Sequence, residues 1–162
     1  MKNNIIRNRK STRIYTKNVY VSDEEILSCI EAASRAPSSK NTQPWRFKII
    51  RDADYIDQLS KVSKVNPWIK RVNSIVIVFR YGQEKDNVKD YLAIGAAIEN
   101  FLLEAESNGI ATCWIGSDDV IEHLKKTDFN DSCTPVALIA MGRGKSSQTI
   151  QTNRYNLDEI IL

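Results

Sequence analysis

Hydrophobic residues recur along this chain with two periods, one typical of amphipathic helices and the other of buried strands. In residues 21–35 the apolar positions repeat at helical spacing, and Ser22 and Glu25 form a capping-box pair at the start. A second helical pattern covers residues 52–64, and Asn66 and Pro67 interrupt it. We predict a helix over each segment, with one apolar face turned towards a core.

Strands are predicted where short apolar runs replace the helical spacing. Residues 74–79, SIVIVF, are apolar and β-branched, as expected of a strand covered on both faces of its sheet. Similar runs lie at 110–115 and 135–141, and a shorter one lies at 46–50. Because these strands lie among helices, we predict one α+β domain over residues 1–162, a sandwich with a central mixed β-sheet flanked by helices.

The longest helical pattern covers residues 88–108, which corresponds to about 30 Å of helix. Asn108 and Gly109 end it in the manner of a left-handed C-cap. Its centre is apolar nearly all round, which predicts a wholly buried helix. Gly95 and the alanines beside it keep the helix thin, so that another backbone can approach closely. Core packing and a subunit interface both explain this composition.

A polar loop follows the first long helix, within residues 36–47. Pro37 and Pro44 stop helix at its two ends, because proline lacks an N–H and restricts the residue before it. The loop could clasp the edge of a flat polar heterocycle, or it could be a surface connection anchored by Trp45. Its hydrogen-bonding side chains are Ser38, Ser39, Asn41, Thr42 and Gln43.

Basic residues gather in residues 2–13. We predict a short helix followed by a turn that presents Arg9, Ser11 and Arg13 together. Arginine offers a planar fork of donors and serine adds a further hydrogen bond, so this group suits a single phosphate. A solvated basic face and a nucleic-acid arm are the alternatives, although such an arm would lack interleaved apolar residues. The apolar residues here are Ile5, Ile6, Ile14 and Tyr15.

The composition argues against several classes of function. A net charge of +3 is too small to indicate nucleic-acid binding by itself. The 3 cysteines form no CxxC pair, and the 1 histidine, His123, lies among charged residues, so no metal site or histidine base is predicted. No signal peptide or membrane span is recognisable, and a cytoplasmic protein is expected.

Motifs of common catalytic sites are missing as well. The sequence contains no HExxH, GxSxG, P-loop or GxGxxG pattern. The GRGK segment at residues 142–145 lacks the spacing and the following helix of a nucleotide-binding loop. An enzyme this poor in acid–base side chains would need a cofactor to carry its reaction.

Two motifs together resemble a known family. RKSTR at residues 9–13, followed by PSSKNTQPW at residues 37–45, is similar to the nitroreductase-like family of FMN-dependent oxidoreductases. The likeness continues through ATCWIG at 111–116, PVALIAMG at 135–142 and RYNLDEII at 154–161. The resemblance implies a nitroreductase-like fold and a homodimer, with the long small-residue helix at the interface and two FMN sites shared between the subunits.

The resemblance also assigns roles to residues of this chain. It implies that FMN carries the chemistry without a catalytic side chain, taking hydride from NAD(P)H at N5 and passing it in a ping-pong cycle to a nitroaromatic, a quinone or a similar acceptor. The phosphate and ribityl chain would be held by Arg9, Lys10, Ser11 and Arg13, with Arg154 on the phosphate side. The isoalloxazine would be approached by Pro37, Ser38, Ser39 and Asn41 of the partner subunit, by Asn66 at its pyrimidine edge, and by Gly116 near N5.

The chain departs from the family pattern at one phosphate-side position. Thr152 stands where many members have a lysine, so phosphate binding would be weaker unless Arg143 or Lys145 substitutes. Two other functions stay open. One is a family relative with different flavin chemistry, such as dehalogenation or dehydrogenation of a specific metabolite. The other is a non-enzymatic nucleic-acid-binding protein that uses the basic N-terminus.

Overall fold

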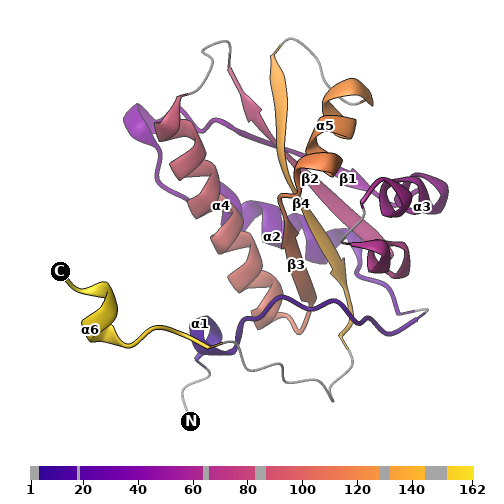
Figure 1. The fold of residues 1–162 in the computed structure, drawn as a ribbon, viewed down its shortest axis with the longest axis horizontal. Helices are drawn as coiled ribbons and strands as arrows, with labels where there is room; N and C mark the ends of the chain where they lie inside the picture. Colours follow the sequence, from indigo (N-terminus) through magenta and orange to yellow (C-terminus); the bar gives the residue numbers. More distant parts are fainter. Residues whose placement is uncertain (1–3, 18, 64–65, 83–86, 128–131, 145–152) are drawn as a thin grey trace.

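A four-stranded sheet lies between two layers of helices (Figure 1). The computed structural model describes residues 4–17, 19–63, 66–82, 87–127, 132–144 and 153–162. The strands are β1 (Trp45–Ile50), β2 (Ser74–Tyr81), β3 (Ala111–Ile115) and β4 (Cys133–Gly142), and they are arranged in the order β1-β2-β4-β3. The predicted α+β architecture is confirmed, and each predicted strand lies at the expected place in the sequence.

Two helices, α2 (Asp23–Ser34) and α4 (Val88–Ser107), cover one face of the sheet. The other face is covered by α3 (Ala53–Val62), the 3-10 turn η2 (Pro67–Arg71) and α5 (Asp118–Thr127). The short elements α1 (Ile5–Asn8), η1 (Ser39–Asn41) and α6 (Leu157–Ile160) lie outside these layers. Within the described ranges, no helix is long and apolar enough to cross a membrane.

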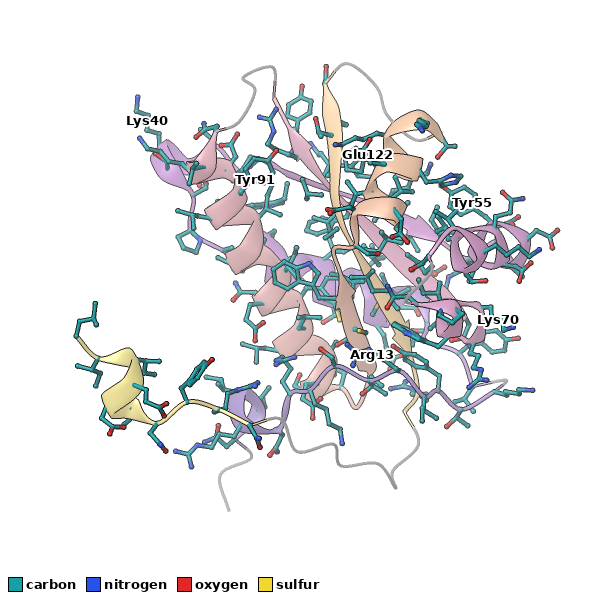
Figure 2. The ribbon with its side chains drawn as sticks, in the orientation of Figure 1. Arg13, Lys40, Tyr55, Lys70, Tyr91 and Glu122 are labelled. Atoms are coloured by element: carbon teal, nitrogen blue, oxygen red, sulfur yellow. The ribbon has the colours of Figure 1, made fainter. Side chains whose placement is uncertain are left out.

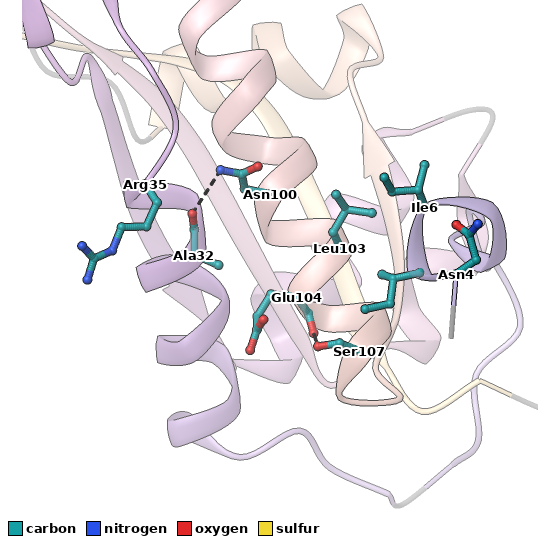
Figure 3. Close-up of a pocket in the computed structure, with 9 residues that line it drawn as sticks. Asn4, Ile6, Ala32, Arg35, Asn100, Leu103, Glu104 and Ser107 are labelled. Carbon is teal, nitrogen blue, oxygen red and sulfur yellow. Dashed lines mark hydrogen bonds between the residues drawn. The ribbon is translucent and has the colours of Figure 1, made fainter. Parts of the chain in front are cut away.

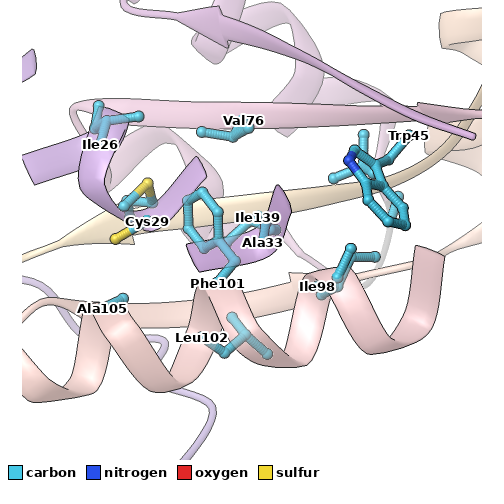
Figure 4. Close-up of a cluster of buried hydrophobic side chains, with 14 of the residues drawn as sticks. Ile26, Cys29, Ala33, Trp45, Val76, Ile98, Phe101, Leu102, Ala105 and Ile139 are labelled. Atoms are coloured by element: carbon cyan, nitrogen blue, oxygen red, sulfur yellow. The ribbon is translucent and has the colours of Figure 1, made fainter. Parts of the chain in front are cut away.

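The sheet separates two hydrophobic clusters because side chains alternate along each strand. On β2, Val76 and Val78 face α2 and α4, while Ile75 and Ile77 face α3 and α5. All four of these side chains are fully buried, which explains why the strand is apolar at successive positions. Figure 4 shows the first cluster, where Phe101 of α4 lies against α2 and the sheet.

The start of α2 follows the sequence prediction closely. The backbone N–H of Glu25 donates to Ser22 Oγ at 3.2 Å, and the N–H of Ser22 donates to Glu25 Oε2 at 2.9 Å. This reciprocal pair satisfies two N–H groups that a helix otherwise leaves without partners. The capping box is therefore present as predicted.

The expected mixture of strand directions is wrong. All three ladders, β1–β2, β2–β4 and β3–β4, are antiparallel. Among the described residues, parallel pairing is limited to an isolated bridge between Ser11 and Thr112 at the outer edge of β3. The apolar runs of β2 and β4 predicted burial on both faces correctly, whereas Trp114 on β3 is 43% exposed. Burial alone does not determine strand direction.

The prediction that α4 is wholly buried also needs correction. Ala97 and Phe101 are completely buried against the core, but Val88 and Leu92 on the same helix are 67% and 70% exposed. Tyr91 is also exposed, and Gly95 and Ala96 are partly exposed. A single chain therefore covers one side of α4 and leaves an apolar side open to solvent.

Candidate functional site

The basic segment, residues 9–13, runs along the free edge of β3 (Figure 1). The N–H of Thr12 donates to the carbonyl of Thr112 at 2.8 Å, and Ser11 pairs with the same strand residue. Strand β4 occupies the other edge of β3. The structure thus brings Arg9, Lys10, Ser11 and Arg13 together as one short extended stretch beside β3.

Arg9 is anchored to the long helix. Its Nε lies 3.3 Å from Glu99 Oε1, and its side chain is only 18% exposed. The ion pair uses one of the five N–H donors of the guanidinium, and the terminal nitrogens can serve a further acceptor. Arg13, labelled in Figure 2, is exposed, and Lys10 is half-buried. The three cationic residues thus follow one another closely along the segment beside β3.

Aromatic residues hold the basic segment against the sheet. The Tyr15 hydroxyl donates to the Thr12 carbonyl at 2.6 Å, and its ring stacks on Trp68 of η2 with centroids 6.1 Å apart. Burial raises the pKa of the Tyr15 hydroxyl, which therefore stays neutral and acts as a donor. A Cβ at Gly142 would approach the Tyr15 ring to 2.8 Å, so glycine is needed there for this packing.

A buried thiol lies beneath the same segment. Burial raises the pKa of Cys113 on β3, while the positive charge of Arg13, a hydrogen bond with Ser11 and the charge of Arg9 act in the opposite direction. The side chain is 2% exposed. Cys113 therefore acts as a neutral core residue under the basic segment.

Asn66 and Gly116 meet at the end of β3. The Asn66 amide nitrogen donates to Ser117 Oγ at 3.4 Å, next to Gly116 in the chain. Gly116 is exposed, and a Cβ added there would meet no heavy atom within 4 Å. The two predicted ring-contacting residues thus lie side by side, with open space in front of the glycine.

The polar loop, residues 37–43, has a strained backbone. Lys40, Asn41 and Gln43 have positive φ angles of 53°, 57° and 48°, each of which costs about 1 kcal/mol or more for a non-glycine residue. The N–H of Gln43 donates to Ser38 Oγ at 3.0 Å, and Arg46 Nη1 donates to the Gln43 carbonyl at 3.1 Å. These bonds hold the loop in one shape. Its other predicted site residues, Pro37, Ser39 and Asn41, are exposed.

The polar loop and the basic segment lie at different places along α4. Figure 2 shows Lys40 beside Tyr91, at the N-terminal end of this 20-residue helix. Arg9, by contrast, contacts Glu99 in its C-terminal half. A single chain therefore does not bring Pro37, Ser38, Ser39 and Asn41 to the basic segment.

The C-terminal residues extend away from the body of the domain (Figure 1). Arg154 is exposed and donates to the carbonyl of the adjacent Asn153 at 3.3 Å. The C-terminal hook, residues 157–162, exposes Leu157, Ile160, Ile161 and Leu162. Thr152 and Lys145 lie outside the described residues.

Arg143, which the sequence suggested as a substitute cation, is engaged within its own chain. Its Nη2 forms an ion pair with Glu25, and its Nη1 donates to the Asn108 carbonyl at 3.0 Å. These contacts join the end of β4 to α2 and to the end of α4. In a single chain, Arg143 therefore supports the scaffold.

An apolar groove of about 620 Å³ lies between α1, α2 and α4 (Figure 3). Ile5, Ile6 and Leu103 line it, and Asn100 closes one end by donating to the Ala32 carbonyl at 3.3 Å. None of the residues predicted to bind a cofactor belongs to this lining. The groove is therefore separate from the β3 edge.

Some contributors to the site were not predicted from the sequence. Glu99 anchors Arg9, and Ser63 and Ser117 hold Asn66, yet each is an ordinary polar residue in its own segment. The position of Ser117 directly after Gly116 was the one available signal. Among the described residues, no group of three or more His, Cys, Asp or Glu side chains is placed to hold a metal ion.

The chain is similar to known proteins in both its sequence and its fold. Residues 6–74 and 62–143 match the nitroreductase family. A crystal structure from Desulfovibrio desulfuricans, provisionally described as a nitroreductase in complex with FMN, has 32% identity and a TM-score of 0.86, over 100% of this chain and 97% of that one. A structure from Parabacteroides distasonis, provisionally named as an NADH dehydrogenase/NAD(P)H nitroreductase, has 30% identity and a TM-score of 0.87, over 98% and 95%.

A protein of Archaeoglobus fulgidus with the same provisional name is 26% identical over 164 residues, which cover 96% of this chain and 94% of that protein.

Proposed function

This chain belongs to the nitroreductase family, and we propose on that basis that it is an FMN-dependent NAD(P)H oxidoreductase. The observation that carries the proposal is the arrangement along the free edge of β3. Ser11 pairs with Thr112 near one end of this strand, and Gly116 follows its other end. The two positions are about 13 Å apart along an extended strand.

The residues at this edge fit the parts of FMN. A dianionic phosphate needs cations and hydroxyl donors, which Arg9, Lys10, Ser11 and Arg13 provide. A heterocycle with a polar edge suits the Asn66 amide and the open space at Gly116. An extended ribityl chain would connect the two ends. The FMN complex of the 32% identical relative supports the same cofactor.

We further propose that the sites are completed in a homodimer. The open side of α4 exposes Val88, Tyr91 and Leu92, which is costly for a helix that remains in water. The polar loop, held in a strained shape, lies at the N-terminal end of α4 and not at its own basic segment. A second copy packed on α4 would cover the apolar side and bring its Pro37, Ser38, Ser39 and Asn41 to the flavin. The exposed C-terminal hook supports the same pairing, and Arg154 would join the phosphate side.

When bound, FMN would supply the redox chemistry, accepting hydride from NADH or NADPH and delivering it to an oxidised acceptor. The chain then needs no nucleophile or general base of its own. Arg9, Ser11 and Arg13 bind the phosphate, and Asn66 orients the ring. Glu99 fixes the position of Arg9, and the exposed Gly116 keeps the approach to the ring free of side chains. Nitroaromatics and quinones are the proposed acceptors.

The proposal is tested with purified protein. We expect it to be yellow, or to take up added FMN, and to be bleached by NADH or NADPH without oxygen. Reoxidation by a nitroaromatic or a quinone should restore the absorbance. A colourless protein that fails to bind FMN would refute the proposal. A yellow protein that neither nicotinamide reduces would refute the assignment of NAD(P)H as reductant.

A further inference from the structure

We infer that Ser63 is a positioning residue that turns the Asn66 amide so that its oxygen, Oδ1, accepts a hydrogen bond from the ligand. The inference rests on the proposed function, because the ligand in question is the flavin ring. It adds a requirement that the ring presents an N–H donor at this point. The N3–H of the isoalloxazine is such a donor.

Ser63 follows the last turn of α3 and is 2% exposed. Its Oγ accepts two hydrogen bonds from the same residue, one from the backbone N–H of Asn66 at 3.1 Å and one from the Asn66 amide nitrogen at 3.0 Å. A buried hydroxyl with both acceptor sites used in this way fixes the backbone and the side chain of Asn66 together.

The remaining hydrogen of the amide is also engaged. The Asn66 amide nitrogen lies 3.4 Å from Ser117 Oγ, on the segment that continues from Gly116. A primary amide has two N–H donors on nitrogen and an acceptor on oxygen. Since both donors point to serine hydroxyls, the group left for a ligand is the oxygen. Asn66 Oδ1 therefore accepts a hydrogen bond from a donor on the ligand.

This orientation has a consequence for specificity. A site that offers an oriented acceptor discriminates against an analogue without the matching N–H, because the acceptor then loses its water without gaining a partner. Without the Ser63 hydroxyl, the amide can rotate and exchange the places of its oxygen and nitrogen. The site should then no longer distinguish a flavin with an N–H at this position from one with an N-methyl group.

The test compares FMN with 3-methyl-FMN, in which a methyl group replaces the N3 hydrogen, by titration with flavin fluorescence. The unmodified chain should bind FMN about tenfold more tightly than the methylated analogue. In Ser63→Ala, the FMN affinity should fall about fivefold and the discrimination should shrink to about twofold. Ser117→Ala leaves the buried hydroxyl in place and should lower the discrimination by about twofold.

Ser60→Ala is the matched control. Ser60 lies on the same helix, is 5% exposed, and its hydroxyl donates to the Asp57 carbonyl at 2.7 Å, away from Asn66. This variant should keep the full discrimination even if its melting temperature falls as much as that of Ser63→Ala. If Ser63→Ala does not fold, Ser63→Cys takes its place, because a thiol of similar size is only a weak acceptor for the two N–H groups of Asn66.

Three outcomes would overturn the inference. The first is equal binding of both flavins by the unmodified chain, and the second is full discrimination in both serine variants. The third is an equal loss of discrimination in Ser60→Ala, which would mean a general structural effect. If the chain binds FMN but gives one of these results, only the role of Ser63 is refuted and the proposed function stands. A chain that binds no FMN refutes the proposed function itself.

Discussion

The basic segment and the polar loop are held in place by different means. The basic segment owes its position to contacts with the rest of its own chain, namely the pairing with Thr112, the Tyr15 stack on Trp68 and the ion pair of Arg9 with Glu99. The polar loop is held mainly by bonds within residues 38–46 and keeps three residues at positive φ. The basic segment is therefore placed by tertiary structure, whereas the polar loop keeps its shape largely through bonds within itself.

The largest effect is expected from a charge on the open side of α4. Leu92→Asp should turn the proposed dimer into a monomer at micromolar concentration, because an unpaired carboxylate cannot be buried in an apolar interface without a cost of several kcal/mol. FMN binding should be lost as well, although Leu92 lies in the N-terminal half of α4 and Arg9 contacts Glu99 in its C-terminal half. Light scattering after gel filtration measures the first effect, and a flavin titration measures the second.

Val19→Asp is the control, since Val19 is 41% exposed and its carbonyl accepts from the Asn73 amide, just before β2. It should stay dimeric and yellow. A Leu92→Asp monomer that still binds FMN tightly would mean that the basic segment needs no partner, and the comparison would fail.

The next largest effect concerns the phosphate side. Arg9→Ala should weaken FMN binding by about a hundredfold, since a charge-assisted arginine contact contributes about 1.5–3 kcal/mol. Arg7→Ala, two positions earlier and exposed, should change it by less than about twofold, as expected of a screened surface charge. Equal losses in the two variants would show that residues 9–13 act only through general positive charge.

A smaller effect is expected from Glu25, which supports the scaffold without touching the basic segment or the polar loop. The Ser22 backbone hydrogen bond and the contact with Arg143 hold the pKa of Glu25 below its ordinary value. Glu25→Gln should lower the free energy of unfolding by about 1 kcal/mol at neutral pH and leave the FMN affinity unchanged. Urea unfolding monitored by circular dichroism measures the loss.

The sign of the pH dependence follows from the depressed pKa. The stabilisation by Glu25 is present above the pKa of the unfolded chain and disappears as the pH falls through the lower pKa of the folded state. The difference between Glu25→Gln and the unmodified chain should therefore vanish in acid. A difference that grows as the pH is lowered would contradict the assignment.

The smallest effect tests the strain in the polar loop. Lys40→Gly should raise the free energy of unfolding by about 0.5 kcal/mol, because glycine accepts a φ of 53° without a Cβ clash but loses more chain entropy. Lys61→Gly, inside α3, should lower it by about 1 kcal/mol. Two losses of equal size would show that the loop conformation carries no strain.

The sequence correctly predicted the structural features that depend only on residues close in the chain or on burial. Ser22 and Glu25 are close in the chain, so their capping box could be recognised directly. The apolar run of β2 required two covered faces, whichever way its neighbours ran. For the same reason strand direction was missed, because Val76 and Ile77 are equally buried in a parallel or an antiparallel sheet.

The errors concern partners that only the folded chain brings together. Leu92 and Phe101 are both apolar residues of one helix, and sequence alone cannot tell which of the two side chains is buried in the core and which is exposed. Arg143 looked like an available cation until Glu25 and the Asn108 carbonyl were found at its guanidinium. The contact of Asn66 with Ser117 joins residues far apart in the sequence. It could not be predicted from either segment.

The central claim is that each flavin site combines the basic segment of one copy with the polar loop of the other, and mixing two defective variants tests it most directly. Arg9→Ala removes the phosphate contact, and Ser39→Trp blocks the exposed loop; alone, neither should retain FMN. After the two variants are unfolded together and refolded as random dimers, half will be mixed, and each mixed dimer will contain one intact site. We therefore predict FMN binding of normal affinity at about a quarter of all sites. No restored binding from two folded, dimeric variants would contradict the account.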